Sequence, residues 1–459
     1  MKSVKPLIPA TLLTALALGG CTKKEEAPNI LLILLDDAGY ADFGFMGCKD
    51  LKTPNIDELA LQGTIFSDAH VVSTVSGPSR AALMTGRYGQ RFGYECNPGK
   101  HEYGIPLTET TMGEVFQQAG YSTAAIGKWH LGSLDEQHPN NRGFDYFYGM
   151  KAGSREYFYN PDGSDKENDV RNILRNNEKT AFYGYLTDVF SDEAIQFITG
   201  ADKPFFMYLS YNAVHTPMQA MEEDLTLFEG HPRQKLAAMT WALDRGIGKV
   251  IDALKNSGKF DNTLIFFLSD NGGAINNQSS NLPLKGFKGN KFEGGHRVPF
   301  FVVWGDKLKS PVPFNGLTSA LDIFTTVMDA AKMNNNKVAE KLDGVSLLPY
   351  LKGMKQGNPH EKLFWRKMDT KAVRYGDYKL IVTKDIDTVL YNVNNDIAEM
   401  TNIRVEETAK YAELMKLIDD WEATCVAPLW IEEGWGHITN SYHERLMHNL
   451  IFEAKDLKK

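Results

Sequence analysis

Five continuous apolar runs recur along the chain, at 29–35, 122–127, 205–211, 263–269 and 299–304. Runs of this kind, without alternating polar positions, are typical of strands buried on both faces of a sheet. The intervening segments carry helical spacing, at 55–61, 111–119, 188–198 and 236–254. Strands that alternate with helices predict an α/β fold, in which a large mixed, mostly parallel sheet has helices on both faces.

The pattern changes near residue 360. Two short amphipathic runs, AVRYGDYKLIV (372–382) and DTVLYNV (387–393), precede a helical segment from Glu406 to Trp421. Since 459 residues exceed one ordinary domain, we expect a main domain over 29–358 and a small α+β subdomain, with an antiparallel sheet and a helix, over 359–459.

The first residues have the pattern of an export signal. Two lysines precede the apolar stretch 12–18, and LGGC ends at Cys21. This indicates a bacterial lipoprotein signal peptide over 1–20 and a mature chain that begins with lipidated Cys21 and a polar tether over 21–28. A retained membrane anchor is the alternative, but the run is shorter than the roughly 20 residues that span a bilayer. We expect an outer-membrane lipoprotein that faces the periplasm or, because KEE resembles a surface-export signal, the cell exterior.

Composition narrows the choice of partners. A hydrophobic fraction of 42% with 24% charged residues is ordinary for a folded protein. The net charge of −8 and the lack of a Lys/Arg block exclude a nucleic-acid partner, which needs a basic surface. Beyond Cys21, the other cysteines have neither paired metal-ligand spacing nor an even count, so we expect no disulfide framework and no zinc site.

The stretch VSGPSRAALMTGRY (75–88) places a serine before a predicted helix. Ser76 opens a Gly-Pro turn, and Gly86 closes the apolar run that follows. A helix N-terminus gathers unpaired N–H groups and the positive end of the helix dipole, which suits a residue that handles an anion. The alternative at this point is that Ser76 is only a helix cap.

Acidic residues follow two of the buried strands. Asp36 and Asp37 come after 29–35, and Asp270 and Asn271 come after 263–269. Ligands of open α/β sheets bind beyond the carboxyl ends of the strands, so the two pairs are expected to converge. Four oxygen ligands favour Ca²⁺, with Mg²⁺ as the alternative metal. Each Asp acting only as a turn cap is the alternative reading.

Basic residues also follow strands or lie near their ends: Lys128 and His130 in GKWHLG, His215 in NAVHTP, and Lys288 before the run 299–304. A lone histidine is usually structural, but here basic residues recur at the ends of several predicted strands. With a divalent cation, Ser76 and Arg80, these residues form the equipment to bind a small tetrahedral anion and move protons near it.

These motifs resemble a known family. SGPSRAALMTGR is similar to the C/S-x-P-x-R signature of the type I sulfatases, whose first residue is oxidised to formylglycine. The resemblance extends through NILLILLDDAGYADFGFMG, TPNIDELALQGTIFSDAH, GKWHLG, GFDYFYG, VHTP, DNGG, EGGHRVP and LYNVNNDIAEMTNI, which cover nearly the whole mature chain. It implies an alkaline-phosphatase-like fold, makes 29–358 the catalytic domain, and sets aside the cap reading of Ser76.

The resemblance also implies a role for each residue. The Ca²⁺ ligands would be Asp36, Asp37, Asp270 and Asn271, completed by modified Ser76. Arg80 and Lys128 would hold the formylglycine and the sulfate oxygens, His130 would hydrogen-bond the diol, and His215 and Lys288 would bind sulfate and serve the leaving oxygen.

The implied chemistry explains the serine. An ordinary alkoxide would leave a stable sulfate ester on the enzyme, whereas one hydroxyl of a formylglycine hydrate attacks sulfur and deprotonation of the other then expels sulfate. In this family serine is matured by an anaerobic radical-type sulfatase-maturing enzyme, which is therefore an expected partner.

Two departures from the family pattern bear on the site. Phe287 stands where glycine often precedes the lysine, so Lys285 and Lys291 stay open as substitutes for Lys288. His296 occupies a usually apolar position, and we expect it to be an extra substrate contact.

The expected reaction is removal of sulfate from a galactose- or hexosamine-type glycan, at an accessible end. The stretch 151–179, rich in Tyr, Arg, Asn and Asp, is expected either to contact the sugar or to be a solvated surface loop. Two alternatives remain at this point: a phosphoesterase or phosphonate hydrolase of the same superfamily that uses unmodified Ser76, and a lipoprotein that binds sulfated glycans without turnover.

Overall fold

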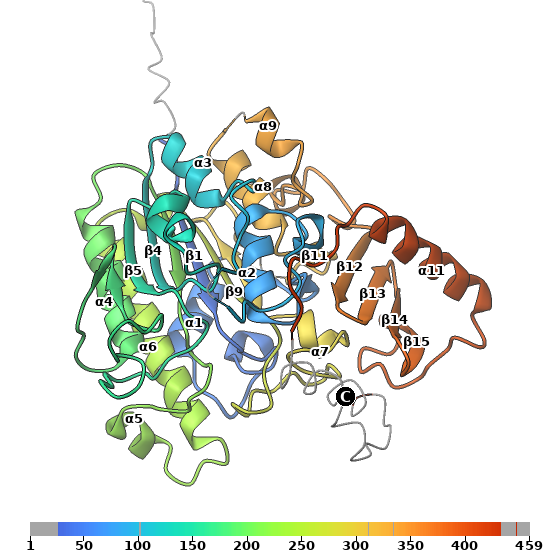
Figure 1. The fold of residues 1–459 in the computed structure, drawn as a ribbon, viewed down its shortest axis with the longest axis horizontal. Coiled ribbons are helices and arrows are strands. Elements are labelled where there is room, and N and C mark those ends of the chain that lie inside the picture. The colour runs from blue at the N-terminus through green and yellow to red at the C-terminus, as the bar shows by residue number, and fades with distance from the viewer. Residues whose placement is uncertain (1–25, 101, 311, 334, 433–446, 448–459) are drawn as a thin grey trace, which may run out of the picture.

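The structure is a computed structural model that describes residues 26–100, 102–310, 312–333, 335–432 and 447 (Figure 1). The expected signal peptide and Cys21 lie outside these residues, as does most of the chain after Glu432. Within the described part of the chain, none of the helices combines the length and the hydropathy needed to cross a membrane.

A nine-stranded sheet forms the centre of the larger domain, in the order β2-β10-β9-β1-β8-β4-β5-β6-β7. Its five central strands β9, β1, β8, β4 and β5 run parallel. The apolar runs predict four of them, and β5 is not among the predicted strands. The strand expected at 299–304 is present as β10 but lies antiparallel to β9. The strands are β1 (Asn29–Leu35), β2 (Thr64–Phe66), β4 (Ser122–Lys128), β5 (Tyr146–Met150), β6 (Leu174–Arg175), β7 (Glu178–Lys179), β8 (Phe205–Ser210), β9 (Thr263–Ser269) and β10 (Phe300–Val303).

Helices cover both faces of this sheet, and alternate residues of β1 contact the two layers. Leu31 and Ile33 pack in one apolar cluster with α1 (Pro54–Ala60), α4 (Leu186–Gly200) and α6 (Gln234–Asn256). Ile30 and Leu32 pack in the other with α2 (Ser76–Thr85), α3 (Met112–Gln118) and α8 (Asp322–Ala330). All residues of β1 are buried because both faces are covered.

Short elements complete this domain. They are η1 (Gly44–Met46), β3 (Ala69–His70), η2 (Gly89–Arg91), η3 (Asp135–Gln137), η4 (Pro139–Arg142), α5 (Glu222–Leu227), η5 (Phe260–Asn262), α7 (Glu293–His296), β11 (Thr318–Ser319), α9 (Asn336–Ala339) and α10 (Leu348–Leu351). β3 and β11 pair with each other in a separate two-stranded parallel sheet.

The C-terminal strands form a separate antiparallel sheet at the right of Figure 1. Its strands are β12 (Lys362–Lys367), β13 (Thr370–Tyr375), β14 (Tyr378–Thr383) and β15 (Asp387–Asn392), and it packs against α11 (Thr408–Glu422). Trp421 of α11 stacks on Phe364 with ring centroids 4.9 Å apart. The expected division at 358/359 stays a prediction.

A buried charge cluster joins this sheet to the larger domain. Lys379 of β14 lies 2.9 Å from Glu293 of α7 and 2.9 Å from Glu399, and all three side chains are buried. Burial and the neighbouring Glu293 raise the pKa of Glu399 to about 7, although Lys379 opposes the shift. Glu399 also accepts a hydrogen bond from the Glu293 N–H at 2.6 Å. Lys379 is therefore shared by two carboxylates at this junction, while Glu293 also pairs with Arg297 at 3.3 Å and Arg374 at 3.9 Å.

We expect Lys379→Met to lower the free energy of unfolding by about 3–5 kcal/mol, because it leaves two buried carboxylates without their shared cation. Chemical denaturation followed by tryptophan fluorescence measures the change. Lys384→Met, at an exposed position just after the same strand, is the matched control and should change stability by less than about 0.5 kcal/mol. Equal effects of the two substitutions would contradict the role given to Lys379.

Candidate active site

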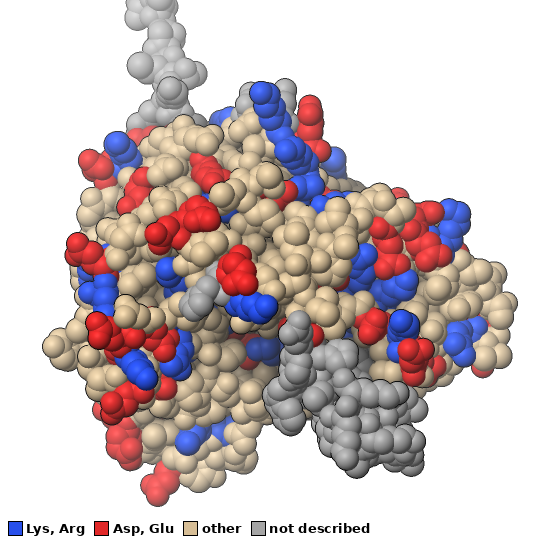
Figure 2. Space-filling model, in the orientation of Figure 1, with Lys and Arg blue, Asp and Glu red and all other residues tan. Residues whose placement is uncertain are grey.

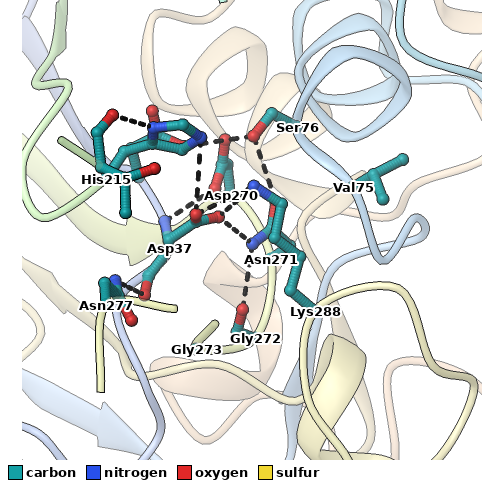
Figure 3. Close-up of polar contacts among 12 residues, drawn as sticks. Asp37, Val75, Ser76, His215, Asp270, Asn271, Gly272, Gly273, Asn277 and Lys288 are labelled. Carbon is teal, nitrogen blue, oxygen red and sulfur yellow. Dashed lines mark hydrogen bonds and ion pairs between the residues drawn. The ribbon is translucent and has the colours of Figure 1, made fainter. Parts of the chain in front are cut away.

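The predicted site residues meet at the carboxyl edge of the parallel strands. Asp36 and Asp37 follow β1, Asp270 and Asn271 follow β9, and Ser76 is the first residue of α2. Figure 3 shows the side chains of Asp37, Asp270, Asn271 and Ser76 gathered in one group. Because β1 and β9 pair in register from Asn29↔Thr263 to Leu35↔Ser269, the residues that follow them emerge side by side.

Ser76 lies against the acidic group. Its Oγ is 3.1 Å from Asp36 Oδ1 and 3.2 Å from Asn271 Oδ1, so its single proton has two acceptors. The amide of Asn271 donates to Asp37 Oδ1 at 2.8 Å, and the Asp37 N–H donates to Asp270 Oδ1 at 3.3 Å. All five side chains are buried. The serine hydroxyl therefore belongs to the carboxylate and amide cluster and is not a cap of its own helix, in which no side-chain cap bond is present.

Three cations surround these carboxylates. Lys128 Nζ lies 2.6 Å from Asp36 Oδ2, Arg80 pairs with Asp270 Oδ2 at 2.8 Å, and Lys288 Nζ lies 2.8 Å from the Asp37 carboxylate. Burial raises the pKa of both Asp36 and Asp37, but nearby positive charges, with Lys128 the largest for the first and Lys288 the largest for the second, together outweigh it and hold each pKa below its ordinary value. The carboxyl groups are thus ionised in the folded protein.

The cluster fits a hard divalent cation. Carboxylate oxygens of three aspartates and the amide oxygen of Asn271 meet in a buried space, and such an all-oxygen set is the type that binds Ca²⁺ or Mg²⁺. Asp36, Asp37 and His215 also place one potential ligand atom each within 4.8 Å of one another. A hard cation prefers the oxygen donors to the imidazole, which leaves His215 available for another task.

His130 faces the same region with an unsatisfied atom. Its Nδ1 is buried and has no hydrogen-bond partner among the described residues, and its backbone adopts a left-handed φ of 58°. Burial and the positive charges of Lys128, Arg80 and Lys288 hold the pKa of His130 well below its ordinary value. A neutral imidazole with a free nitrogen is suited to a hydrogen bond with a bound group.

His215 is fixed in one tautomer by its own turn. Its Nδ1 lies 2.7 Å from the Thr216 carbonyl, which only accepts hydrogen bonds, so Nδ1 carries a proton. Nε2 points toward Asp37 Oδ2 at 3.6 Å, as Figure 3 shows. The nitrogen that faces the site is therefore Nε2, which the Thr216 carbonyl leaves free for a contact with a bound molecule.

Tyr157 holds this turn from outside. Its hydroxyl donates to the carbonyls of Asn212 and His215, at 2.7 and 2.8 Å, and its ring stacks on Tyr185. Tyr157 is fully buried. The hydroxyl thus ties the backbone of His215 to the segment between β5 and α4.

The structure places the three lysines that the sequence left open in different surroundings. Lys285 lies over the Phe292 ring and donates to the Glu399 carbonyl, and Lys291 donates to Thr74 Oγ1 at 3.0 Å. Lys288 contacts an acidic residue of the site, with its Nζ 2.8 Å from the Asp37 carboxylate. The roles assigned to the six catalytic residues stay predictions.

The expectation for His296 is wrong. Its side chain is fully buried, its Nδ1 lies 2.9 Å from His70 Nδ1, and its ring stacks on Trp365. A position that is apolar elsewhere in the family accommodates histidine here because His70 and the Lys291 carbonyl satisfy its nitrogens. It does not reach a substrate.

The stretch 151–179 is not a plain solvated loop, because several of its side chains are buried, and its contact with a sugar stays a prediction. Arg155 is buried, pairs with Asp165 at 2.8 Å and lies over the Phe182 ring. Tyr157 is buried as described above. These residues hold the loop together from inside, so a sugar can contact only the remaining polar side chains of this stretch.

Sequence reasoning missed the residues that support the site. Tyr157 is one, and Asn277 is another: its buried amide donates to the carbonyls of Asp37 and Val214, at 3.1 and 3.0 Å (Figure 3). Tyr94 donates to the His130 carbonyl at 3.1 Å. Each of them acts on backbone carbonyls, for which the sequence carries no signal.

Fold and site together describe an α/β protein with a carboxylate cluster, surrounding cations and a serine at a helix N-terminus, an arrangement suited to hydrolysis of esters of tetrahedral anions. A comparison with family models refines this class: residues 28–333 match the family model described as Sulfatase. The chain belongs to the sulfatase family and is a sulfuric ester hydrolase. The phosphoesterase and the non-catalytic alternatives are accordingly set aside.

Relatives with curated names agree. The chain is 36% identical over 435 residues to an uncharacterized sulfatase, YdeN, of Escherichia coli K12, which covers 80% of this chain and 75% of YdeN. It is 34% identical over 386 residues to N-acetylgalactosamine-6-sulfatase of Mus musculus, covering 77% and 72%. Among solved structures, Ps i-CgsB in complex with k-i-k-neocarrahexaose is similar at 35% identity and a TM-score of 0.83, covering 94% of this chain and 99% of that one.

We expect Tyr157→Phe to lower kcat for a sulfate ester about fivefold with little change in KM, because a hydrogen bond of about 1 kcal/mol that orients His215 is lost. Steady-state kinetics measures the split. Tyr185→Phe is the matched control, since the Tyr185 hydroxyl donates to Gln219 and not to the His215 turn. An equal loss of kcat in both variants would show a general packing effect and contradict the orienting role.

Proposed function

We propose that this protein removes sulfate from a carbohydrate by means of a formylglycine derived from Ser76, with Ca²⁺ bound by Asp36, Asp37, Asp270 and Asn271. The observation that carries the proposal is the position of Ser76 Oγ, within 3.2 Å of two oxygens of the metal-type cluster. A serine at this place, in a C/S-x-P-x-R sequence, is the residue that the family converts. Formylglycine and Ca²⁺ would supply, respectively, the nucleophile and a positive charge against the sulfate oxygens.

The surrounding residues have separate tasks in this proposal. Lys128 and Arg80 supply positive charge to the sulfate oxygens and hold the side chain at position 76 in place. Lys288 has its pKa raised, since Asp37 and Asp36 outweigh the effect of burial, and stays charged against the anion. His130 supplies a neutral nitrogen for a hydrogen bond to the modified side chain.

His215 is suited to the leaving oxygen. Its Nε2 faces the site while Nδ1 is occupied by the Thr216 carbonyl. A sugar hydroxyl is a poor leaving group and needs a proton as the S–O bond breaks. His215 acts as the general acid in its doubly protonated form, which carries a proton on Nε2 as well as on Nδ1; it gives the Nε2 proton to the leaving oxygen and is left as the neutral Nδ1–H tautomer. Tyr157 keeps the imidazole at this place.

A carbohydrate substrate is supported by the relatives. One is named N-acetylgalactosamine-6-sulfatase, and the Ps i-CgsB structure carries k-i-k-neocarrahexaose. We propose a galactose- or hexosamine-type sugar that bears the sulfate at an accessible end. Figure 2 shows acidic and basic side chains interspersed over one face of the molecule, in keeping with a substrate that binds at one site and not along a charged surface.

We also propose a cellular setting. The pattern of the first 21 residues supports cleavage before Cys21, lipidation, and attachment to the bacterial outer membrane with the enzyme on the periplasmic side or the cell surface. A serine precursor supports maturation by an anaerobic radical-type sulfatase-maturing enzyme. Of the residues that carry these two proposals, only Ser76 is among those that the structure describes.

The experiment that tests the proposal is mass spectrometry of the Ser76 peptide from protein made with a serine-type maturing enzyme. We expect this peptide to lose two hydrogen atoms, and Ser76→Ala to keep less than about a hundredth of the turnover of a sulfated sugar. Ser79→Ala, one turn along the same helix, is the control and should remain active. Full activity of protein with an intact serine would overturn the formylglycine proposal.

Asp270→Asn is expected to weaken Ca²⁺ binding at least about tenfold, because it replaces a charged ligand with a neutral one. Isothermal titration of protein stripped of metal measures the affinity. Asp261→Asn alters an exposed acidic residue at the other end of β9 and serves as the control. Unchanged affinity in Asp270→Asn would move the metal away from this cluster.

A further inference from the structure

A polar cavity lies at the end of β5, close to the sheet edge at which the candidate active-site residues meet. It has a volume of about 300 Å³, and its lining includes Lys151, Lys179, Asn168, Asn172 and Asn177. Lys151 directly follows β5, which pairs in parallel with β4, the strand that carries Lys128. The Lys151 carbonyl also accepts a hydrogen bond from the His130 N–H at 3.2 Å. The cavity therefore borders the segment that supplies His130.

The charge of this cavity suits an anion. Lys151 Nζ donates to the Ser133 carbonyl and Lys179 Nζ to the Asp165 carbonyl, both at 2.7 Å. Among the described residues, neither lysine forms an ion pair with a carboxylate. The one acidic side chain of the lining, Asp169, is already paired with Arg171 at 2.6 Å. The lining thus keeps two positive charges that no described carboxylate pairs with.

A buried amide adds a second, independent requirement. Asn172 is only 4% exposed, its Nδ2 donates to the Lys166 carbonyl, and its Oδ1 is buried without a partner among the described residues. An unpaired buried acceptor costs roughly 1–3 kcal/mol, so a donor that reaches Asn172 from the cavity, from a ligand or a water molecule, is favoured. Sugar hydroxyls are donors, and two lysines attract a sulfate group.

The cavity is built before any ligand arrives. Its hairpin is attached to β5 through the Gly149↔Leu174 pair and through Asn176, which accepts a hydrogen bond from the Phe147 N–H at 3.0 Å. The preceding loop is held from inside by Arg155, as described above. A preformed site loses little ordering entropy on binding.

We propose that this cavity is a second subsite, which binds a sulfated sugar unit adjacent to the unit whose sulfate is removed. The inference rests on the proposed function and narrows its substrate class: an oligosaccharide with sulfate on neighbouring units is preferred over a sulfated monosaccharide. The lysines bind the second sulfate, and Asn172 accepts a hydrogen bond from a hydroxyl of the same sugar.

The test compares a long and a short substrate. The double variant Lys179→Gln/Asn177→Ala removes one charge and one amide from exposed lining positions. We expect it to raise KM for k-i-k-neocarrahexaose or a chondroitin 6-sulfate hexasaccharide about tenfold, and to leave kcat/KM for 4-nitrophenyl sulfate within about twofold, since an aryl sulfate does not extend to the cavity. Lys166→Gln changes an exposed lysine outside the lining and is the control.

Binding separates this inference from the proposed function. Titration of both hexasaccharides into Ser76→Ala protein, with and without the double substitution, measures affinity in the absence of turnover. An affinity about tenfold weaker in the double variant supports the subsite even if wild-type protein hydrolyses neither substrate. Unchanged affinity, no binding of either hexasaccharide, or an equal loss on hexasaccharide and aryl sulfate would overturn it.

Discussion

The balance between buried carboxylates and buried cations at the edge of the main sheet is the constraint on which the rest of the structure depends. Asp36, Asp37 and Asp270 are held close together out of water, an arrangement that repulsion would break without compensation. Lys128, Arg80 and Lys288 provide that compensation from three further segments of the chain. The cations that compensate the carboxylates thus border the place proposed for the anionic ester, so one set of contacts serves stability and the proposed chemistry.

This arrangement needs a rigid frame, which the two layers of helices and the second sheet supply. The parallel pairing of β1 with β9 brings the acidic pairs together, and the cluster of Lys379, Glu293 and Glu399 fastens the loop after Lys288 to the C-terminal sheet. The C-terminal region therefore supports the segment that follows Lys288, although none of the residues predicted as catalytic or metal-binding comes from this region.

Much of the fold and most residues of the candidate site could be predicted, because buried strands appear as unbroken apolar runs and polar residues of the site come directly after these runs in the sequence. The direction of β10 could not be predicted, since an unbroken apolar run looks the same in a parallel and in an antiparallel strand. His296 was misjudged because its burial depends on His70 and Trp365, which lie 226 and 69 positions away in the chain. Tyr157 escaped notice for a related reason: its partner is the backbone of His215, 58 residues later, and a carbonyl is the same in every residue.

The link between Tyr157 and His215 has a consequence for how enzymes of this kind diversify. The segment between β5 and α4 carries the polar cavity on one side and the anchor of the His215 turn on the other. Exchanging this segment between relatives would also exchange or remove the tyrosine that holds the backbone of His215. If the proposed roles of the cavity and of His215 hold, a change of sugar recognition here has to keep position 157 and its hydroxyl.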